Sequence, residues 1–293
     1  MFEGCTVALV TPFKRNGDVD FRKLDELVDF HLSSGTDCIA PCGTTGESPT
    51  LSHEEHEAVV EAVVKRVRGR TQVMAGTGSN STREAIRLTK FAKKAGADGA
   101  LVVSPYYNKP EPEGMYQHYK AIAASAGIPI VVYNVPGRTG RSVTPETIAR
   151  LSKIKNIVAV KDASGDLDEA SEIRSLCDIT ILSGDDSRTL PLMAVGGKGI
   201  ISVVGNIIPR DMGNMVKAFQ KGDVKKAERL HRKLFPLCKA MFYESNPIPV
   251  KTAMKMLGRL NGVMRLPLST MSPKNAGRLR SALKAYGLRR GSR

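Results

Sequence analysis

One lysine in this sequence stands where its amine could act as a nucleophile. Lys161 follows four apolar residues, Ile157 to Val160, so we expect its side chain to lie in the protein core. Burial of an ammonium ion is unfavourable and favours the neutral amine, which is the form that attacks a ketone. Lys161 is therefore a candidate for imine formation. An ion-paired or solvent-exposed lysine is the alternative that its position leaves open.

Several hydroxyl groups could move the protons that such a reaction requires. Tyr133 ends another apolar run, and its phenol could exchange protons with a bound intermediate. Thr44, Thr45 and Tyr107 could pass a proton between that phenol and solvent. A core tyrosine with one structural hydrogen bond is the alternative interpretation of Tyr133.

Two further features could bind a carboxylate. Arg138 follows a Pro-Gly turn, and a guanidinium group can bind a carboxylate through two parallel hydrogen bonds. A surface arginine is the alternative. Gly43 and Gly46 flank the two threonines, and glycines at these positions would leave backbone N–H groups accessible to an anion.

Eight short β-rich runs alternate with helical patterns and are expected to position these residues. The runs are apolar throughout, which is typical of strands buried on both faces of a parallel sheet. The expected strands cover 6–10, 38–41, 72–75, 100–103, 129–133, 157–161, 179–183 and 199–204. The expected helices cover 21–33, 53–68, 82–95, 113–126, 145–153, 167–176 and 187–196. Ser52 and Glu55 form a predicted capping box at the start of one helix.

Eight strand–helix repeats predict a closed (β/α)8 TIM barrel. An open doubly wound sheet is the alternative, but no GxGxxG or phosphate-loop pattern supports it. Reactive groups in such barrels lie at the carboxyl ends of the strands, where all the candidates above fall. From about residue 210 the pattern is helical, with prolines expected to interrupt it at 236, 247, 249, 267 and 273. We predict a catalytic barrel over 1–224 and a small all-helical C-terminal domain over 225–293.

The composition narrows the class of protein. The 293 residues are 41% hydrophobic and 25% charged, which is typical of a folded domain and fits one large barrel with an appendix. No apolar run reaches the roughly 18 residues of a membrane helix, and the N-terminus reads as a strand. We therefore expect a cytoplasmic protein with no membrane partner. The five scattered cysteines favour buried thiols over disulfides, and a zinc site at Cys38 and Cys42 is a minor alternative.

The net charge of +15 is concentrated at one end of the chain. Residues 251–293 contain eleven Lys or Arg residues and no Asp or Glu. Such a surface is usually solvated, and neither an RNA-binding aromatic motif nor zinc-finger spacing accompanies it. We expect no nucleic-acid partner, and a regulatory or nucleic-acid-binding barrel is the non-enzymatic alternative.

Six spaced motifs resemble the dihydrodipicolinate synthase branch of the pyruvate-dependent class I aldolase family, which also contains the N-acetylneuraminate lyases. They occur in family order from about residue 3 to about residue 285. The motifs are GTTGES (43–48), SPYYNKP (104–110), YNVPGRTG (133–140), KDASGDL (161–167), LSGDD (182–186) and NPIPVK (246–251).

The resemblance implies a role for individual residues. Lys161 would form a Schiff base with pyruvate, and Tyr133 would be the general acid and base. Thr44 and Tyr107 would form the proton relay, with Tyr107 donated across a dimer interface. Arg138 would bind the carboxylate of L-aspartate 4-semialdehyde. The implied substrate-binding residues are Thr45, Arg138, Ile201 (through its backbone) and Gly184.

The resemblance also implies the reaction. Pyruvate and L-aspartate 4-semialdehyde would condense to 4-hydroxy-tetrahydrodipicolinate, at the entry to the diaminopimelate route to L-lysine. Because the lysine imine serves as the electron sink, no metal or organic cofactor is expected. The implied assembly is a homotetramer built as a dimer of dimers. The alternative is a 2-keto-3-deoxy acid or N-acetylneuraminate aldolase, but these relatives lack the arginine of YNVPGRTG.

A second, regulatory site is implied as well. Family members that L-lysine inhibits bind it at a dimer interface. Glu84 would pair with the ammonium group, while Asn80 and Tyr106 would hold the carboxylate. For His53 and His56, the ordinary polar start of a helix is the alternative. The implied effector-binding residues are Ser48, His53, His56, Asn80, Glu84 and Tyr106.

Overall fold

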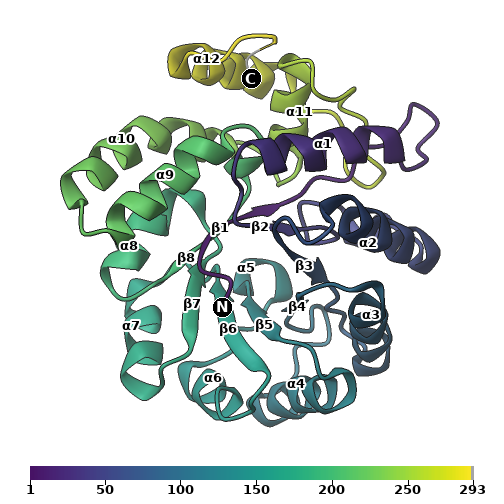
Figure 1. The fold of residues 1–293 in the computed structure, drawn as a ribbon, viewed down its shortest axis with the longest axis vertical. Coiled ribbons are helices and arrows are strands. Elements are labelled where there is room, and N and C mark those ends of the chain that lie inside the picture. Colours follow the sequence, from purple (N-terminus) through teal and green to yellow (C-terminus); the bar gives the residue numbers. More distant parts are fainter. Residues whose placement is uncertain (292–293) are drawn as a thin grey trace.

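The computed structural model describes residues 1–291, and it confirms the predicted closed barrel. The eight strands pair in chain order, each parallel to its neighbours, and β1 pairs with β8 to close the barrel (Figure 1). The strands are β1 (Gly4–Ala8), β2 (Cys38–Ala40), β3 (Gln72–Gly76), β4 (Gly99–Val103), β5 (Ile130–Asn134), β6 (Ile157–Asp162), β7 (Thr180–Ser183) and β8 (Gly199–Ser202).

Alternation along the strands sorts side chains between the barrel interior and the surrounding helices. One apolar cluster takes residues from all eight strands, so it fills the interior. On β5, Val131 and Tyr133 belong to this cluster, whereas Ile130 and Val132 pack in the cluster that lies beneath the helices. Both faces of the strands are therefore buried, which explains their continuous apolar sequence.

Helices surround the barrel, and most begin at a capping side chain. Ser52 and Glu55 form the predicted capping box at the start of α2. The helices up to the last of the barrel are α1 (Phe21–Ser33), α2 (His53–Val67), α3 (Thr82–Ala95), α4 (Pro112–Ala126), α5 (Pro136–Thr139), α6 (Pro145–Leu151), α7 (Leu167–Leu176), α8 (Thr189–Ala194) and α9 (Pro209–Gln220). Three short 3₁₀ turns are η1 (Ser48–Thr50), η2 (Asp186–Arg188) and η3 (Val204–Asn206).

Three further helices follow the barrel: α10 (Val224–Ala240), α11 (Ile248–Met256) and α12 (Pro273–Tyr286). The helix α10 packs on α9, and α12 packs on both α10 and α11 (Figure 1). Their buried side chains join one apolar cluster with residues of β1, α1 and α2. The domain division after residue 224 stays a prediction, and residues 292–293 of the predicted 225–293 domain lie outside the described residues.

Some expected boundaries were wrong. Pro236 does not interrupt a helix, because α10 continues through it. It lies on the exposed side of α10, where water can bind the carbonyl that a proline leaves without an N–H partner. The expected helix 187–196 is divided into η2 and α8, and the expected strand 199–204 ends at Ser202 because η3 follows.

The described residues also bear on the membrane and metal interpretations. Between residues 1 and 291, no helix has the length and apolarity to cross a membrane. Within the same range, no group of three or more His, Cys, Asp and Glu side chains is placed to hold a metal ion. All five cysteines are free thiols. Burial raises the pKa of Cys38 to about 12, so this side chain behaves as a small apolar residue.

Candidate active site

The alternation on β5 and β6 brings Lys161 and Tyr133 together at the carboxyl end of the barrel. The two residues are direct partners in the strand register. Lys161 lies two residues after Ala159 of the interior cluster, so its side chain points inward too. The side chains are buried, with 5% of Lys161 and 6% of Tyr133 exposed. The Lys161 Nζ atom lies 4.0 Å from the centre of the Tyr133 ring.

A cavity of about 140 Å³ opens over these two side chains. It is lined by six of the eight residues predicted from the sequence for catalysis and substrate binding: Thr44, Thr45, Tyr133, Arg138, Lys161 and Gly184. Gly184 allows β7 to approach the lysine closely. A Cβ atom there would lie 2.7 Å from the Ala163 Cβ and 3.1 Å from the Lys161 Cε, so any other residue would force a displacement.

The turn after β2, which borders this cavity, has two unpaired backbone donors. Among residues 1–291, the N–H groups of Thr44 and Thr45 have no hydrogen-bond acceptor. The expectation for Gly46 was wrong, because its N–H group donates to the Gly43 carbonyl at 3.0 Å within the turn. An anion at this turn would therefore meet the amides of the threonines, and the Gly46 amide serves to close the turn.

Arg138 sits on the one-turn helix α5, directly after β5. Its Nη2 atom donates to the Asn246 carbonyl at 3.1 Å, and the Asn246 Nδ2 atom donates to Thr45 Oγ1 at 2.9 Å. Asn246 also lines the cavity. Its Oδ1 atom is buried without a partner among the described residues, so it remains available to a bound molecule. The sequence signal for Asn246 was the NPIPVK motif, from which no role for this residue was drawn.

Two nominated residues do not line the cavity of their own chain. The Tyr107 side chain is 90% exposed, in the loop after β4, and its backbone has a φ of +71°. Positive φ is uncommon for a residue other than glycine. Ile201 is buried in β8 within the interior cluster.

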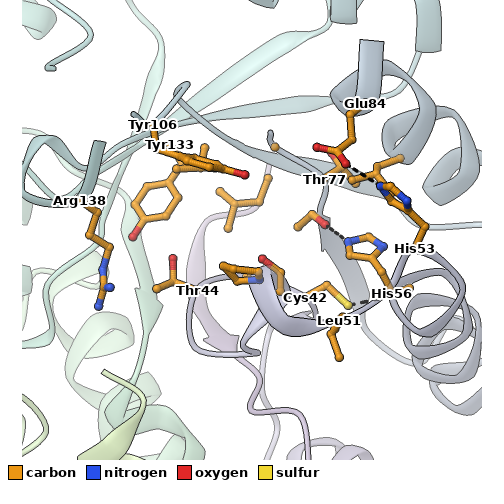
Figure 2. A pocket seen from close by; sticks show the side chains of 18 of the residues that line it. Cys42, Thr44, Leu51, His53, His56, Thr77, Glu84, Tyr106, Tyr133 and Arg138 are labelled. Carbon is orange, nitrogen blue, oxygen red and sulfur yellow. Dashed lines mark hydrogen bonds and ion pairs between the residues drawn. The ribbon is translucent and has the colours of Figure 1, made fainter. Parts of the chain in front are cut away.

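A larger cavity of about 590 Å³ adjoins the first and shares Thr44, Tyr133 and Arg138 with it. Figure 2 shows these three residues at one side of the larger cavity and His53, His56 and Glu84 at the other. Five of the six nominated effector residues line it: Ser48, His53, His56, Glu84 and Tyr106. The sixth, Asn80, does not line this cavity, and its carbonyl accepts a hydrogen bond from Asn108.

Polar contacts define the charge of the larger cavity. Glu84 accepts a hydrogen bond from Ser79 and lies 2.6 Å from the His53 Nε2 atom. The hydrogen bond from Ser79 has the largest effect in lowering the pKa of Glu84, and the contact with His53 lowers it further. The Glu84 carboxylate is therefore ionised and could bind a cation. The His56 Nε2 atom donates to the Gly76 carbonyl at 2.7 Å. Burial lowers the pKa of His56, which favours the neutral ring.

Comparison with known proteins covers nearly the whole chain. A family model described as the dihydrodipicolinate synthetase family matches residues 1–286. A relative from Syntrophus aciditrophicus (strain SB), named 4-hydroxy-tetrahydrodipicolinate synthase, is 54% identical over 290 residues, or 98% of this chain and 99% of the relative. A relative of the same name from Citrifermentans bemidjiense is also 54% identical, over 98% of this chain and all of its own.

Solved structures that are similar to this chain have the same fold and are named as the same kind of enzyme. The crystal structure of dihydrodipicolinate synthase from Aquifex aeolicus has a TM-score of 0.97 and 50% identity, covering 99% of this chain and 100% of that one. The chloride-inhibited enzyme from Acinetobacter baumannii, crystallised with pyruvate, has a TM-score of 0.96 and 45% identity, with 98% and 100% coverage. The enzyme from Cyanidioschyzon merolae with lysine bound has a TM-score of 0.95 and 42% identity, with 98% and 99% coverage.

Proposed function

This chain belongs to the dihydrodipicolinate synthetase family of lyases, and from that premise we propose that it condenses pyruvate with L-aspartate 4-semialdehyde to 4-hydroxy-tetrahydrodipicolinate. The observation that carries the proposal is the Lys161 amine, buried at the base of a cavity against the Tyr133 ring. The Acinetobacter baumannii relative was crystallised with pyruvate, which supports pyruvate as the first substrate.

The first half of the reaction builds a nucleophile from pyruvate. The Lys161 amine adds to the pyruvate carbonyl, and loss of water gives an imine. A methyl proton then leaves, and the electron pair of the broken C–H bond forms a carbon–carbon double bond. The protonated imine nitrogen accepts the pair displaced from the C=N bond, which gives an enamine. The Tyr133 hydroxyl exchanges these protons. The free N–H groups of Thr44 and Thr45 hold the pyruvate carboxylate.

The second half joins the aldehyde and closes a ring. Arg138 binds the carboxylate of L-aspartate 4-semialdehyde, and the enamine carbon attacks the aldehyde, whose oxygen becomes a hydroxyl group. The amine of this substrate then adds to the imine carbon. Lys161 leaves as a free amine, and a six-membered heterocycle forms. The overall reaction releases one water molecule and leaves the enzyme unchanged.

Proton transfer to solvent requires a second protomer in this proposal. Thr44 lines the cavity, but Tyr107 extends away from its own chain. Tyr107 is exposed and has a positive φ. Because such strained backbone conformations cluster at functional sites, these features fit a residue that is inserted into the site of a neighbouring protomer. We expect a homotetramer built from such dimers, located in the cytoplasm.

Substrate consumption distinguishes the proposed reaction from the aldolase alternative. The purified protein should consume pyruvate only when L-aspartate 4-semialdehyde is present, with one heterocyclic product detected by mass spectrometry. Incubation with 2-keto-3-deoxy acids or N-acetylneuraminate should release no pyruvate. Release of pyruvate from either compound, without condensation, would reverse the assignment.

We propose L-lysine as the ligand of the larger cavity. The ionised Glu84 and the neutral His56 suit an ammonium group, and the Cyanidioschyzon merolae relative was crystallised with lysine bound. Calorimetric titration should give an isotherm with L-lysine that is weakened in Glu84→Gln, together with inhibition of turnover. An absence of binding at millimolar L-lysine would contradict this assignment and leave the synthase reaction untouched.

A further inference from the structure

The NPIPVK segment, residues 246–251, reaches the turn of the active site at two points. Asn246 bonds to Thr45, as described above. Five residues later, the Lys251 Nζ atom donates to Glu47 Oε1 at 2.5 Å. Glu47 follows the two threonines on the same turn. The second contact has no part in the reaction steps derived so far.

The ion pair between Glu47 and Lys251 is withdrawn from solvent. The two side chains are 0% and 1% exposed. Burial lowers the pKa of Lys251, and the adjacent Glu47 carboxylate offsets only part of this effect. The Lys251 Nζ atom also donates to the Thr11 carbonyl at 2.9 Å and lies 4.3 Å from the centre of the Phe13 ring. The positive charge of Lys251 is therefore balanced by Glu47, and its hydrogen-bond donors are bound to fixed acceptors.

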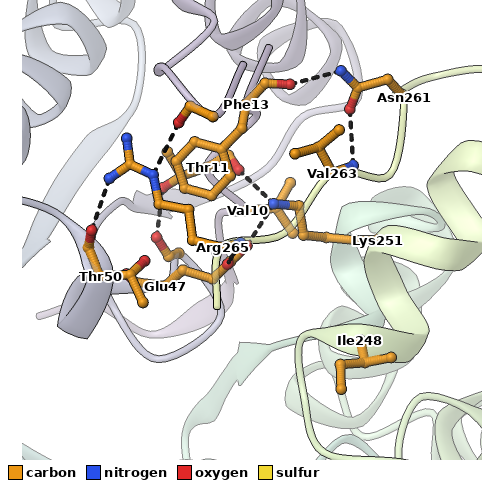
Figure 3. A network of polar contacts seen from close by, with 12 residues as sticks. Val10, Thr11, Phe13, Glu47, Thr50, Ile248, Lys251, Asn261, Val263 and Arg265 are labelled. Carbon is orange, nitrogen blue, oxygen red and sulfur yellow. Dashed lines mark hydrogen bonds and ion pairs between the residues drawn. The ribbon is translucent and has the colours of Figure 1, made fainter. Parts of the chain in front are cut away.

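The other carboxylate oxygen of Glu47 is held from a second segment of the C-terminal region (Figure 3). Glu47 Oε2 accepts the backbone N–H group of Arg265 at 3.1 Å. The Arg265 guanidinium binds both oxygens of Glu55, near the start of α2, and it also lies against the Phe13 ring. The position of Glu47 is thus set by the region that follows the barrel.

The backbone of Glu47 connects this anchor to the cavity. Its φ of +56° lies in the left-handed region, which a residue other than glycine adopts only at some cost. Its N–H group donates to the Thr44 carbonyl at 3.1 Å. The Thr11 hydroxyl fixes the preceding residue by donating to the Gly46 carbonyl at 2.6 Å. A displacement of the Glu47 side chain would therefore move Thr44.

A buried ion pair of this kind contributes little net stability compared with apolar residues of similar volume. Its effect is to fix the relative position of the two side chains, because a buried charge without its partner is strongly unfavourable. Neither Glu47 nor Lys251 lines either of the two cavities, so neither can touch a substrate there. Any influence on the reaction must pass through the turn.

We propose that Glu47 and Lys251 are positioning residues for the reaction: their buried ion pair holds Thr44 and Thr45 at the cavity of Lys161. This inference rests on the proposed function, because it assigns the two threonines to proton transfer and carboxylate binding. Lys161 and Tyr133 stand on β6 and β5 and do not depend on the turn. Loss of the ion pair should therefore weaken pyruvate binding and proton transfer, while the Lys161 amine should still form the imine when pyruvate is saturating.

The test separates geometry from stability with the double variant Glu47→Gln/Lys251→Met. Removing both charges together should leave the melting temperature within about 3 °C of the wild type. Its kcat should nevertheless fall about 10-fold to 100-fold, as expected for a misplaced group. Reductive trapping of pyruvate on Lys161 should persist. The single variant Glu47→Gln leaves Lys251 with a buried, unpaired charge, so it should lose stability as well as kcat, and the double variant is the one that decides.

Lys217→Met is the matched control, because it breaks a lysine–carboxylate pair (Lys217 to Asp37, 2.9 Å) away from both cavities. Its kcat should equal that of the wild type. A stable double variant with unchanged kcat would overturn the proposal, since a purely structural pair predicts that result. The crystal structure of the double variant gives an independent answer. A turn with Thr44 unmoved would reject the positioning role, whereas a wild type without condensation activity would reject only the function on which the role was built.

Discussion

Lys161 and Tyr133 owe their arrangement to a property of neighbouring strands. Residues paired in a parallel register lie side by side, and residues two apart share a face. The apolar run before Lys161 made its burial predictable from the sequence. Its contact with Tyr133 depends on the register between two strands that are 28 residues apart at these positions, and only the folded barrel reveals it.

Arg138 is expected to determine affinity for the second substrate. Arg138→Lys keeps the charge but loses the planar pair of donors, so KM for L-aspartate 4-semialdehyde should rise about tenfold or more. KM for pyruvate should change little. Steady-state kinetics with each substrate varied in turn measures this split.

Arg141→Lys provides the control for Arg138→Lys, because Arg141 is close in sequence but its guanidinium binds Glu111 at the surface. Both kinetic constants should stay near wild type in this variant. Equal increases of KM for the two substrates in Arg138→Lys would contradict a specific role in binding the aldehyde.

Asn246 shows what motif matching leaves undefined. The motif that contains it carried the resemblance to the family, yet no role for the asparagine followed from the sequence. The structure places it between Thr45 and Arg138 with one buried oxygen unpaired. That arrangement joins a loop before α11 to residues about 110 and 200 positions earlier, and no local pattern encodes such a contact.

Among the elements, the strands were predicted with boundaries within two residues of the observed ones. All eight strands were expected, and the structure closes them in chain order. Boundaries were less accurate, because a strand ends where pairing ends and not where apolar residues end. Val203 and Val204 illustrate this: they continue the apolar run of β8 but leave the sheet at the start of η3.

Asp186 joins the ends of β7 and β8 and should make the stability of the protein pH-dependent. Its carboxylate accepts hydrogen bonds from the Ser202 hydroxyl at 2.5 Å and from the backbone of Val203 and Val204. Burial raises its pKa from 3.8 to about 6. The folded protein therefore binds this proton more tightly than the unfolded chain.

The resulting prediction concerns the difference in unfolding free energy between the wild type and Asp186→Asn. That difference should be most favourable to the wild type below pH 4. It should decrease by roughly 3 kcal/mol as the pH rises to about 6 and stay constant above it. Urea denaturation at intervals of pH measures it. A difference that is independent of pH, or that grows between pH 4 and 6, would contradict the raised pKa.

At the scale of the whole molecule, the exposed Tyr107 predicts that one protomer completes the site of another. Lys161→Ala lacks the nucleophile, and Tyr107→Phe lacks the donated hydroxyl. In a mixed dimer, the Tyr107→Phe protomer keeps Lys161 and receives Tyr107 from its partner, so one of the two sites is intact. Co-expression of the two variants in equal amounts should restore about a quarter of wild-type activity.

Each variant expressed alone is the control and should have little activity. Analytical ultracentrifugation of the wild type should show an oligomer. Co-expressed variants no more active than the separate proteins would show that Tyr107 acts within its own chain or not at all. The donation of Tyr107 to a partner protomer was expected only from the resemblance to the family. The sequence of one chain does not indicate which surface an exposed tyrosine contacts in an oligomer.

The C-terminal helices extend the same argument to the complete chain. Their presence was predicted, and they share an apolar cluster with the barrel. Their connection to the active site through Glu47 and Lys251 was not predicted. A lysine at the end of NPIPVK resembles many other basic residues of that region, and only burial distinguishes it from them.

The central claim is that Lys161 forms an imine with pyruvate, and reductive trapping tests it directly. The protein is incubated with pyruvate and borohydride, digested and examined by mass spectrometry. We predict a pyruvate-derived adduct on the peptide that contains Lys161 and no adduct in Lys161→Ala. A folded wild-type protein without the adduct, or one modified at another lysine, would contradict the account.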